Sequence, residues 1–181
     1  MSGLFQAKYD QAVVLVTHVS EVSDLVQGIV CNKVSETELA QLLVERPSTL
    51  LNRPGATNWN RLAFGKLGPF LDARVFDGGP VLEADLDANL RWLHPYGESV
   101  PGAVQLAPGV WLGGDVEAVA GLEAELAARG WPPRWRLLHG GAAWTQAQLA
   151  LELERGIWIH ARAGIGSRAV AALCLGGGPG G

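Results

Sequence analysis

The sequence predicts one α/β or α+β domain, built on a mixed β-sheet with helices at its periphery. The 181 residues lie within the usual range for a single domain, and 48% hydrophobic residues suffice for a core. Glycine supplies 24 residues, close to twice its average share of about 7%, which favours short elements and many turns over a helical bundle. Short apolar runs alternate with segments of helical pattern. We expect a domain over residues 1–160 and a flexible glycine-rich tail over 161–181.

The N-terminal part of the chain predicts two strands and a helix. Ala12–Thr17 and Gln27–Asn32 are short and rich in β-branched residues, which predicts a pair of strands and burial of the first on both faces. Ser35 and Glu38 have the spacing of a capping box, in which each side chain binds a backbone amide of the other residue. This spacing predicts a short helix that begins here and ends near Leu43.

The middle of the chain predicts a long loop followed by several strands. Prolines and glycines interrupt every periodic pattern between Arg46 and Phe70, which favours a loop there. Further short apolar segments predict strands at Ala73–Phe76, Leu90–His94, Ala103–Leu106, Val110–Leu112, Trp135–Leu138 and Ile157–His160.

Two more helices are predicted from their N-caps. Asp115 is a good N-cap for a helix that runs to about Arg129. We expect an apolar face formed by Val119, Leu122 and Leu126 and solvated glutamates at Glu117, Glu123 and Glu125. Thr145 and Gln148 repeat the capping-box spacing and predict a helix that ends at Gly156.

Two glycine doublets follow apolar runs, one in Asp77-Gly78-Gly79-Pro80 and one in Gly113-Gly114-Asp115. Glycine tolerates positive φ and close approach of another backbone, so each doublet is either a structural corner or a site lined by main chain. In the second doublet the Asp115 carboxylate competes with any anion for the helix N-terminus, so we expect a cap. In the first we favour a corner and keep an open crevice as the alternative.

Four spaced motifs in this chain resemble those of the AlgH-like family, whose members occur in bacteria and, in a related form, in plants and algae. The matching residues are Val13–His18 with Gly28, Val30, Asn32 and Lys33; Phe76–Val81; Pro108–Asp115; and Gly140, Ala142, Trp144, Gln148, Leu149, Glu152, Gly156 and Trp158. The resemblance implies a compact domain of mixed sheet with peripheral helices. It implies no established activity, although members carry a regulatory name from alginate synthesis. Asn32, Lys33 and Trp144 join the two doublets as candidate site residues.

The chain departs from the family pattern at several places. Val34 and Ala143 stand where the family usually has proline and glycine, and Gly141 stands where an aromatic residue is common. No strand is predicted before Val13, and the segment after Ala161 differs from the family's last segment. These departures indicate either a truncated chain or a divergent member with an open sheet edge.

No catalytic or metal site is predicted. His18, His94, His139 and His160 each end or follow an apolar run without a partner at metal-ligand spacing, so we favour satisfied strand-end residues over bases. The acidic residues near the first doublet, Asp72, Asp77, Asp85 and Asp87, are expected to be solvated rather than to hold a cation. Gly164–Ala169 spells a dinucleotide-binding pattern but lacks the following strand and acidic residue, so no cofactor is predicted.

Charge and hydropathy exclude other classes. With 14 basic and 18 acidic residues the chain has no positive field for duplex nucleic acid. Its apolar runs fall short of the ~20 residues of a membrane span, and two distant cysteines favour a reducing compartment. We expect a cytoplasmic protein, or a plastid one if its N-terminus lies upstream.

Three functions remain open from the sequence. The first is a non-catalytic binding or regulatory domain for a protein partner or a small ligand. The second is a hydrolase with His18, His94 or His139 as base at the glycine corners. The third is a weak binder of single-stranded nucleic acid through Arg134 and Arg136, with Trp135 in the core.

Overall fold

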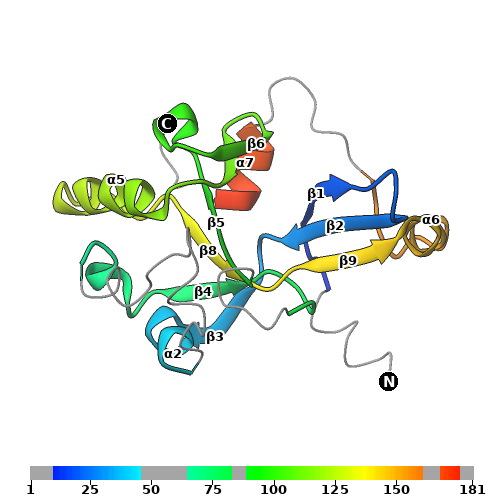
Figure 1. Cartoon of the computed structure of the whole chain (residues 1–181), viewed down its shortest axis with the longest axis horizontal. Coiled ribbons are helices and arrows are strands. Elements are labelled where there is room, and N and C mark those ends of the chain that lie inside the picture. Colours follow the sequence, from blue (N-terminus) through cyan, green and yellow to red (C-terminus); the bar gives the residue numbers. More distant parts are fainter. Residues whose placement is uncertain (1–9, 46–64, 83–88, 161–167, 176–181) are drawn as a thin grey trace.

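The computed structural model describes residues 10–45, 65–82, 89–160 and 168–175, which form two β-sheets side by side with helices around them (Figure 1). The combination of mixed sheets and several helices confirms the predicted α+β class. None of the described helices is long and apolar enough to cross a bilayer.

The smaller sheet has three antiparallel strands in the order β1-β2-β9. They are β1 (Val14–Val19), β2 (Leu25–Val30) and β9 (Ala142–Thr145). The prediction that the first strand is buried on both faces is wrong, because Val16 and Val19 are 50% and 53% exposed. Strand β1 pairs only with β2 among the described strands, so its other edge has no strand partner there.

The larger sheet has six strands in the order β3-β4-β8-β5-β7-β6. Their bounds are β3 (Val34–Glu38), β4 (Arg74–Asp77), β5 (Leu90–His94), β6 (Ala103–Ala107), β7 (Val110–Gly113) and β8 (Arg136–His139). Strands β4 and β8 run parallel and the other neighbours antiparallel, so the sheet is mixed as predicted.

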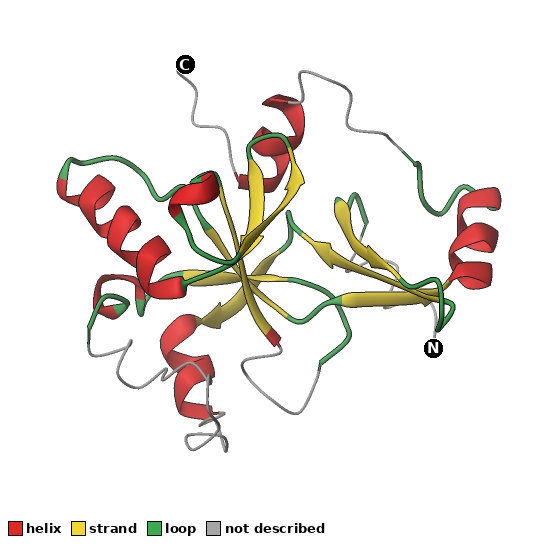
Figure 2. Cartoon of the chain, turned by 45° about the horizontal axis from the view of Figure 1, so that its top comes forward, coloured by secondary structure: helices red, strands yellow, loops and turns green. Residues whose placement is uncertain are grey.

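The helices gather mainly around the larger sheet, whereas α6 lies at the outer end of the smaller one (Figure 2). The α-helices are α2 (Leu39–Glu45), α5 (Val116–Ala128), α6 (Gln146–Glu154) and α7 (Arg168–Leu175). Two short 3-10 helices, η1 (Gly68–Phe70) and η2 (Gly97–Ser99), precede β4 and β6. Of the predicted long loop, residues 46–64 lie outside the described part.

The central strands of the larger sheet are buried on both faces. Trp92 and Leu137 belong to one core cluster, with residues of α2, α5 and η1, whereas Leu93 and Leu138 belong to a second, with Cys174 of α7. Successive side chains of a strand point to opposite faces, so β5 and β8 each contribute to both clusters. Trp135 lies in the first cluster, as predicted.

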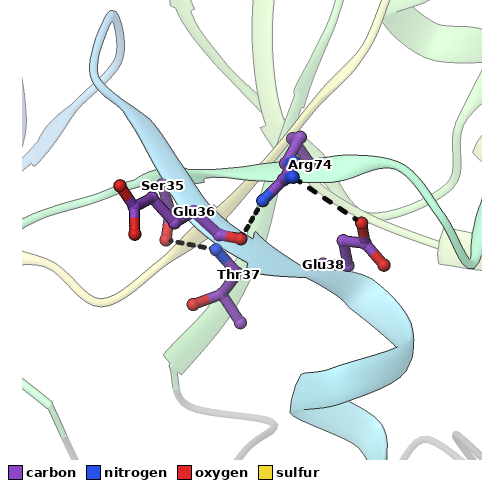
Figure 3. Close-up of polar contacts among 5 residues, drawn as sticks. All are labelled: Ser35, Glu36, Thr37, Glu38 and Arg74. Atoms are coloured by element: carbon purple, nitrogen blue, oxygen red, sulfur yellow. Dashed lines mark hydrogen bonds and ion pairs between the residues drawn. The ribbon is translucent and has the colours of Figure 1, made fainter.

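The predicted capping box at Ser35 is wrong (Figure 3). Ser35–Glu38 lie in β3, where Ser35 Oγ accepts a hydrogen bond from Thr37 N at 3.1 Å. Arg74 of β4 donates to the Glu36 carbonyl, and its Nη2 lies 3.8 Å from Glu38 Oε1. Because these residues pair with β4, they form a strand instead of a helix start, and the helix begins at Leu39.

Two C-terminal predictions also differ from the structure. Ile157 and Trp158 form a bend and no strand follows at Ile159 and His160, with Ile159 92% exposed. Part of the predicted tail is helical, since α7 packs Val170, Ala171 and Cys174 into the second core cluster. Residues 161–167 and 176–181 lie outside the described part, and the boundary at residue 160 stays a prediction.

Candidate functional site

The first glycine doublet lies where the two sheets meet. Gly78 N donates to His139 O at 2.8 Å, and Gly78 O accepts from Val30 N of β2 at 2.8 Å. A Cβ atom on Gly78 would lie 2.4 Å from Gly140 O, far inside van der Waals contact. The two backbones touch here, so this doublet is the structural corner that the sequence favours.

The rest of the first motif supports the same corner. Asp77 Oδ1 accepts from Gly79 N at 3.0 Å, and Val81 exchanges two backbone hydrogen bonds with Gly141, at 2.8 and 2.9 Å. Pro80 lies exposed between these contacts. The motif thus joins β4 to the segment that links β8 to β9.

A small crevice opens beside this corner. Its volume is about 30 Å³, enough for a small polar group. The lining residues, which define the seam crevice below, are Gln27, Val81, Asn89, Arg91, Gly140, Gly141, Ala142 and Ala143. They come from β2, β5, β9 and the adjoining segments, and thus from both sheets.

Arg91 supplies the only charge among the lining residues of the seam crevice. It lies half-buried on β5, and a Cβ atom on Gly141 would be 3.5 Å from its Nη1. Within the described part of the chain, no carboxylate or carbonyl group pairs with this guanidinium. The arrangement suits an anionic group, because a guanidinium can hold a carboxylate by two parallel hydrogen bonds.

The second doublet is a helix start, as predicted. Asp115 Oδ1 accepts from Glu117 N at 2.8 Å and from Ala118 N at 3.3 Å, which confirms the N-cap of α5. Gly113 and Gly114 have φ values of +69° and +81°, which glycine adopts without strain. The helix N-terminus therefore carries its own carboxylate.

His94 is a buried structural residue beside this doublet. Its Nε2 lies 3.0 Å from Gly113 O, and its Nδ1 accepts from Tyr96 N at 3.3 Å, so the ring is neutral with the proton on Nε2. The ring stacks on Tyr96, with the centroids 5.7 Å apart. Burial lowers the pKa of His94 below its ordinary value, because the charged form would lose solvation.

We expect this histidine to make stability fall in mild acid. Below pH 6.5, the ordinary histidine value, the unfolded chain takes up a proton that the folded chain refuses, so the free energy of unfolding declines by at most about 1.4 kcal/mol per pH unit. Above that pH the contribution of the neutral His94 to the free energy of unfolding is fully retained. Urea unfolding at pH 7.5 and 5.5 should show a smaller decline in His94→Gln than in the parent. The exposed-site control His18→Gln should decline as the parent does, and an equal decline in all three would contradict the assignment.

The structure does not bring the histidines together. His139 pairs with Leu90 at one end of β5, whereas His94 lies at the other end. His18 and His160 are exposed on β1 and after α6. In the described ranges no three His, Cys, Asp or Glu side chains gather as metal ligands. Asp85 and Asp87 lie outside those ranges.

Asn32 and Lys33 anchor the chain before β1 instead of lining the crevice. Asn32 Oδ1 accepts from Val13 N at 2.8 Å, and Asn32 Nδ2 donates to Gln11 O at 2.9 Å. Lys33 Nζ donates to the Asp10 carbonyl.

Trp144 lies apart from both doublets, between β9 and α6. Its Nε1 donates to Glu152 Oε2 at 3.0 Å, and Trp158 Nε1 donates to the same atom at 2.7 Å. The two indole rings meet edge to face, with centroids 6.0 Å apart. The candidate residues of the sequence therefore fall into separate structural roles, and none of them lines the crevice. The first doublet lies next to it, against Gly140 and Gly141.

A family model described as AlgH-like matches residues 1–169. The chain belongs to the AlgH-like family. The solution structure of the AlgH protein from Pseudomonas aeruginosa has a similar fold, with a TM-score of 0.50 over 98% of this chain and 86% of that one, at 22% identity. The resemblance stated from the motifs is thereby confirmed.

The curated relatives of this AlgH-like protein are proteins of an uncharacterised family. A UPF0301 protein of Pelodictyon phaeoclathratiforme is 32% identical over 93 residues, and one of Chlorobaculum tepidum is 34% identical over 93 residues. Each alignment covers 51% of this chain and 46% of the relative. The aligned part thus spans about half the length of the curated relatives.

Proposed function

We propose that this AlgH-like protein is a non-catalytic binding domain whose seam crevice receives the carboxylate end of a ligand. The observation that carries the proposal is the lining of the crevice, which presents a half-buried guanidinium without a pairing carboxylate in the described part of the chain. The lining includes two side-chain amides but no Ser, Cys, His, Asp or Glu, hence no nucleophile or general base.

The size of the crevice limits what enters it. A volume of about 30 Å³ accommodates an end group and leaves the body of the ligand outside. We infer that the ligand is a small carboxylic acid or the acidic side chain of a partner, held at Arg91 and oriented by the Gln27 amide.

The two alternative functions draw no specific support from the described residues. A hydrolase would need a base at the glycine corners, and the histidine closest to the second doublet is occupied by Gly113 O and Tyr96 N. A nucleic-acid platform would need Arg136 in solvent, but its Nη1 donates to Leu173 O at 2.9 Å and its guanidinium lies over the Phe76 ring.

Ligand-dependent thermal shifts test the proposal. Acetate, succinate and glutarate should raise the unfolding temperature, and at a hundredfold excess over Kd the gain is about 2.7 kcal/mol, or roughly 5–10 °C. The shift should vanish in Arg91→Gln, because the amide carries no charge, and fall in Arg91→Lys, which loses the two-pronged contact. Arg129→Gln, which removes an exposed arginine after α5, is the matched control and should keep the full shift. Shifts that survive in Arg91→Gln, or turnover of an added ester, would contradict the proposal.

A further inference from the structure

Two cysteines far apart in the sequence meet in the core. Cys31 follows β2 and Cys174 lies in the last turn of α7, and their Sγ atoms are 3.2 Å apart. Both side chains are 0% exposed, within a cluster that includes Leu93, Val110 and Leu138. This contact ties the C-terminal helix to the strands of both sheets.

We propose that Cys31 and Cys174 are a reversible dithiol–disulfide pair that locks helix α7 onto the sheets. A disulfide has its sulfur atoms about 2.05 Å apart, so the two Sγ atoms need to approach by little more than 1 Å. Side-chain rotation and a small shift of a terminal helix suffice for that movement.

Arg136 gives the pair an electropositive setting. Its guanidinium donates to the carbonyl groups of Cys31 and Leu173, so it spans both sides of the contact. The hydrogen bond with Cys31 and the charge of Arg136 both lower the pKa of Cys174, although burial opposes them. The same hydrogen bond and burial raise the pKa of Cys31. We assign the attack to Cys174, because it lies on the helix that must move before an oxidant can enter.

Access to the pair requires that α7 lifts from the sheet. Neither sulfur is exposed in the closed form, so an oxidant cannot reach them there. Helix α7 has eight residues, and an isolated helix of that length is unstable in water, so it is held in place by its packing on the sheet and is free to unfold once it lifts. The disulfide consequently forms only after α7 has transiently lifted from the sheet.

A small disulfide such as oxidised glutathione is the co-reactant that balances the step. The Cys174 thiolate attacks one of its sulfur atoms, forms a mixed disulfide and releases one glutathione thiolate. When α7 returns, the Cys31 thiolate attacks Cys174 Sγ and releases the second. The protein loses two electrons and two protons, and the oxidised glutathione becomes two thiols.

Oxidation of the whole chain tests the lock. The fully reduced protein is incubated with oxidised glutathione, and then denatured, alkylated and weighed by mass spectrometry. We expect a monomer lighter by two hydrogen atoms with a Cys31–Cys174 peptide, and an unfolding temperature raised by roughly 10 °C, because the bridge closes a loop across positions 143 apart. Excess reduced glutathione should restore the original mass and temperature.

Variants separate the lock from adventitious oxidation. Cys31→Ser should stop at a mixed disulfide on Cys174 and show no rise in unfolding temperature. If that variant fails to fold, Arg136→Gln provides the second comparison, with slower disulfide formation at the same pH because the thiolate has lost its cation. Thiols that stay free in the parent, disulfide-linked dimers in place of the monomer, or a bridge that reduced glutathione cannot open would overturn the proposal.

Discussion

Replacing Gly79 by alanine is expected to cost about 3–5 kcal/mol of the free energy of unfolding. Gly79 has a φ of +136°, a conformation almost confined to glycine. A Cβ atom there would lie 2.3 Å from Gly141 O and 2.9 Å from Ala142 N, both backbone atoms that cannot rotate away. To relieve this clash, Val81 would have to separate from Gly141, and that movement would break the contact that joins the sheets. Urea unfolding should show a markedly lower midpoint.

Gly113→Ala is the matched control within the other doublet. Its φ of +69° is also positive, but a Cβ atom there would have no neighbour within 4 Å. Only the left-handed backbone cost remains, about 1 kcal/mol. Equal losses in the two variants would show that the close approach at Gly79 adds nothing to the backbone effect.

Local signals account for the elements that the sequence predicted. Asp115 caps α5 because its side chain needs only the amides of the next turn, and Thr145 caps α6 through Gln148 N in the same way. In Thr145–Gln148, however, the Gln148 side chain binds Glu152 rather than closing a reciprocal box. Caps of this kind are fixed within a few residues and can be predicted from the sequence.

Long-range pairing explains where prediction failed. Ser35–Glu38 has an equally good capping pattern, but Val34 pairs with Phe76 and Glu38 pairs with Arg74, both far away in the sequence. Strand β9 (Ala142–Thr145) was missed, because it becomes a strand by pairing with β2. Such partners cannot be identified from local propensity.

Of the candidate site residues predicted from the sequence, some lie next to the crevice but none lines it. The first doublet was identified, because glycines report close backbone approach, whereas Arg91 carried no signal within an apolar strand. The crevice around it depends on the contact between two sheets, which the sequence does not specify locally.

Glu123 was predicted to be solvated but is buried, although its position in the helix indicates burial. It continues the spacing of Val116, Val119 and Ala120, the buried face of α5.

Glu123→Ala is expected to cost about 3 kcal/mol of the free energy of unfolding. The carboxylate is 1% exposed and accepts from Tyr96 Oη and, at 3.0 Å to each oxygen, from Arg134 N. Burial raises the pKa of Glu123, and these hydrogen bonds oppose the rise. The carboxylate thereby fastens α5 to the turn after β5 and to the start of β8. Truncation would leave buried donors without an acceptor, and that penalty exceeds the net value of the hydrogen bonds themselves.

Glu125→Ala provides the matched control, because this glutamate lies two residues away on the exposed face of the same helix and should change stability by less than about 0.5 kcal/mol. Glu123→Gln keeps one oxygen acceptor, so its loss should fall between those of the two alanine variants. Tyr96→Phe removes a single donor, and combining it with Glu123→Gln in a double-mutant cycle isolates the contact between the two side chains. Strictly additive losses, or similar losses in Glu123→Ala and Glu125→Ala, would show that the buried carboxylate does not hold these three segments together.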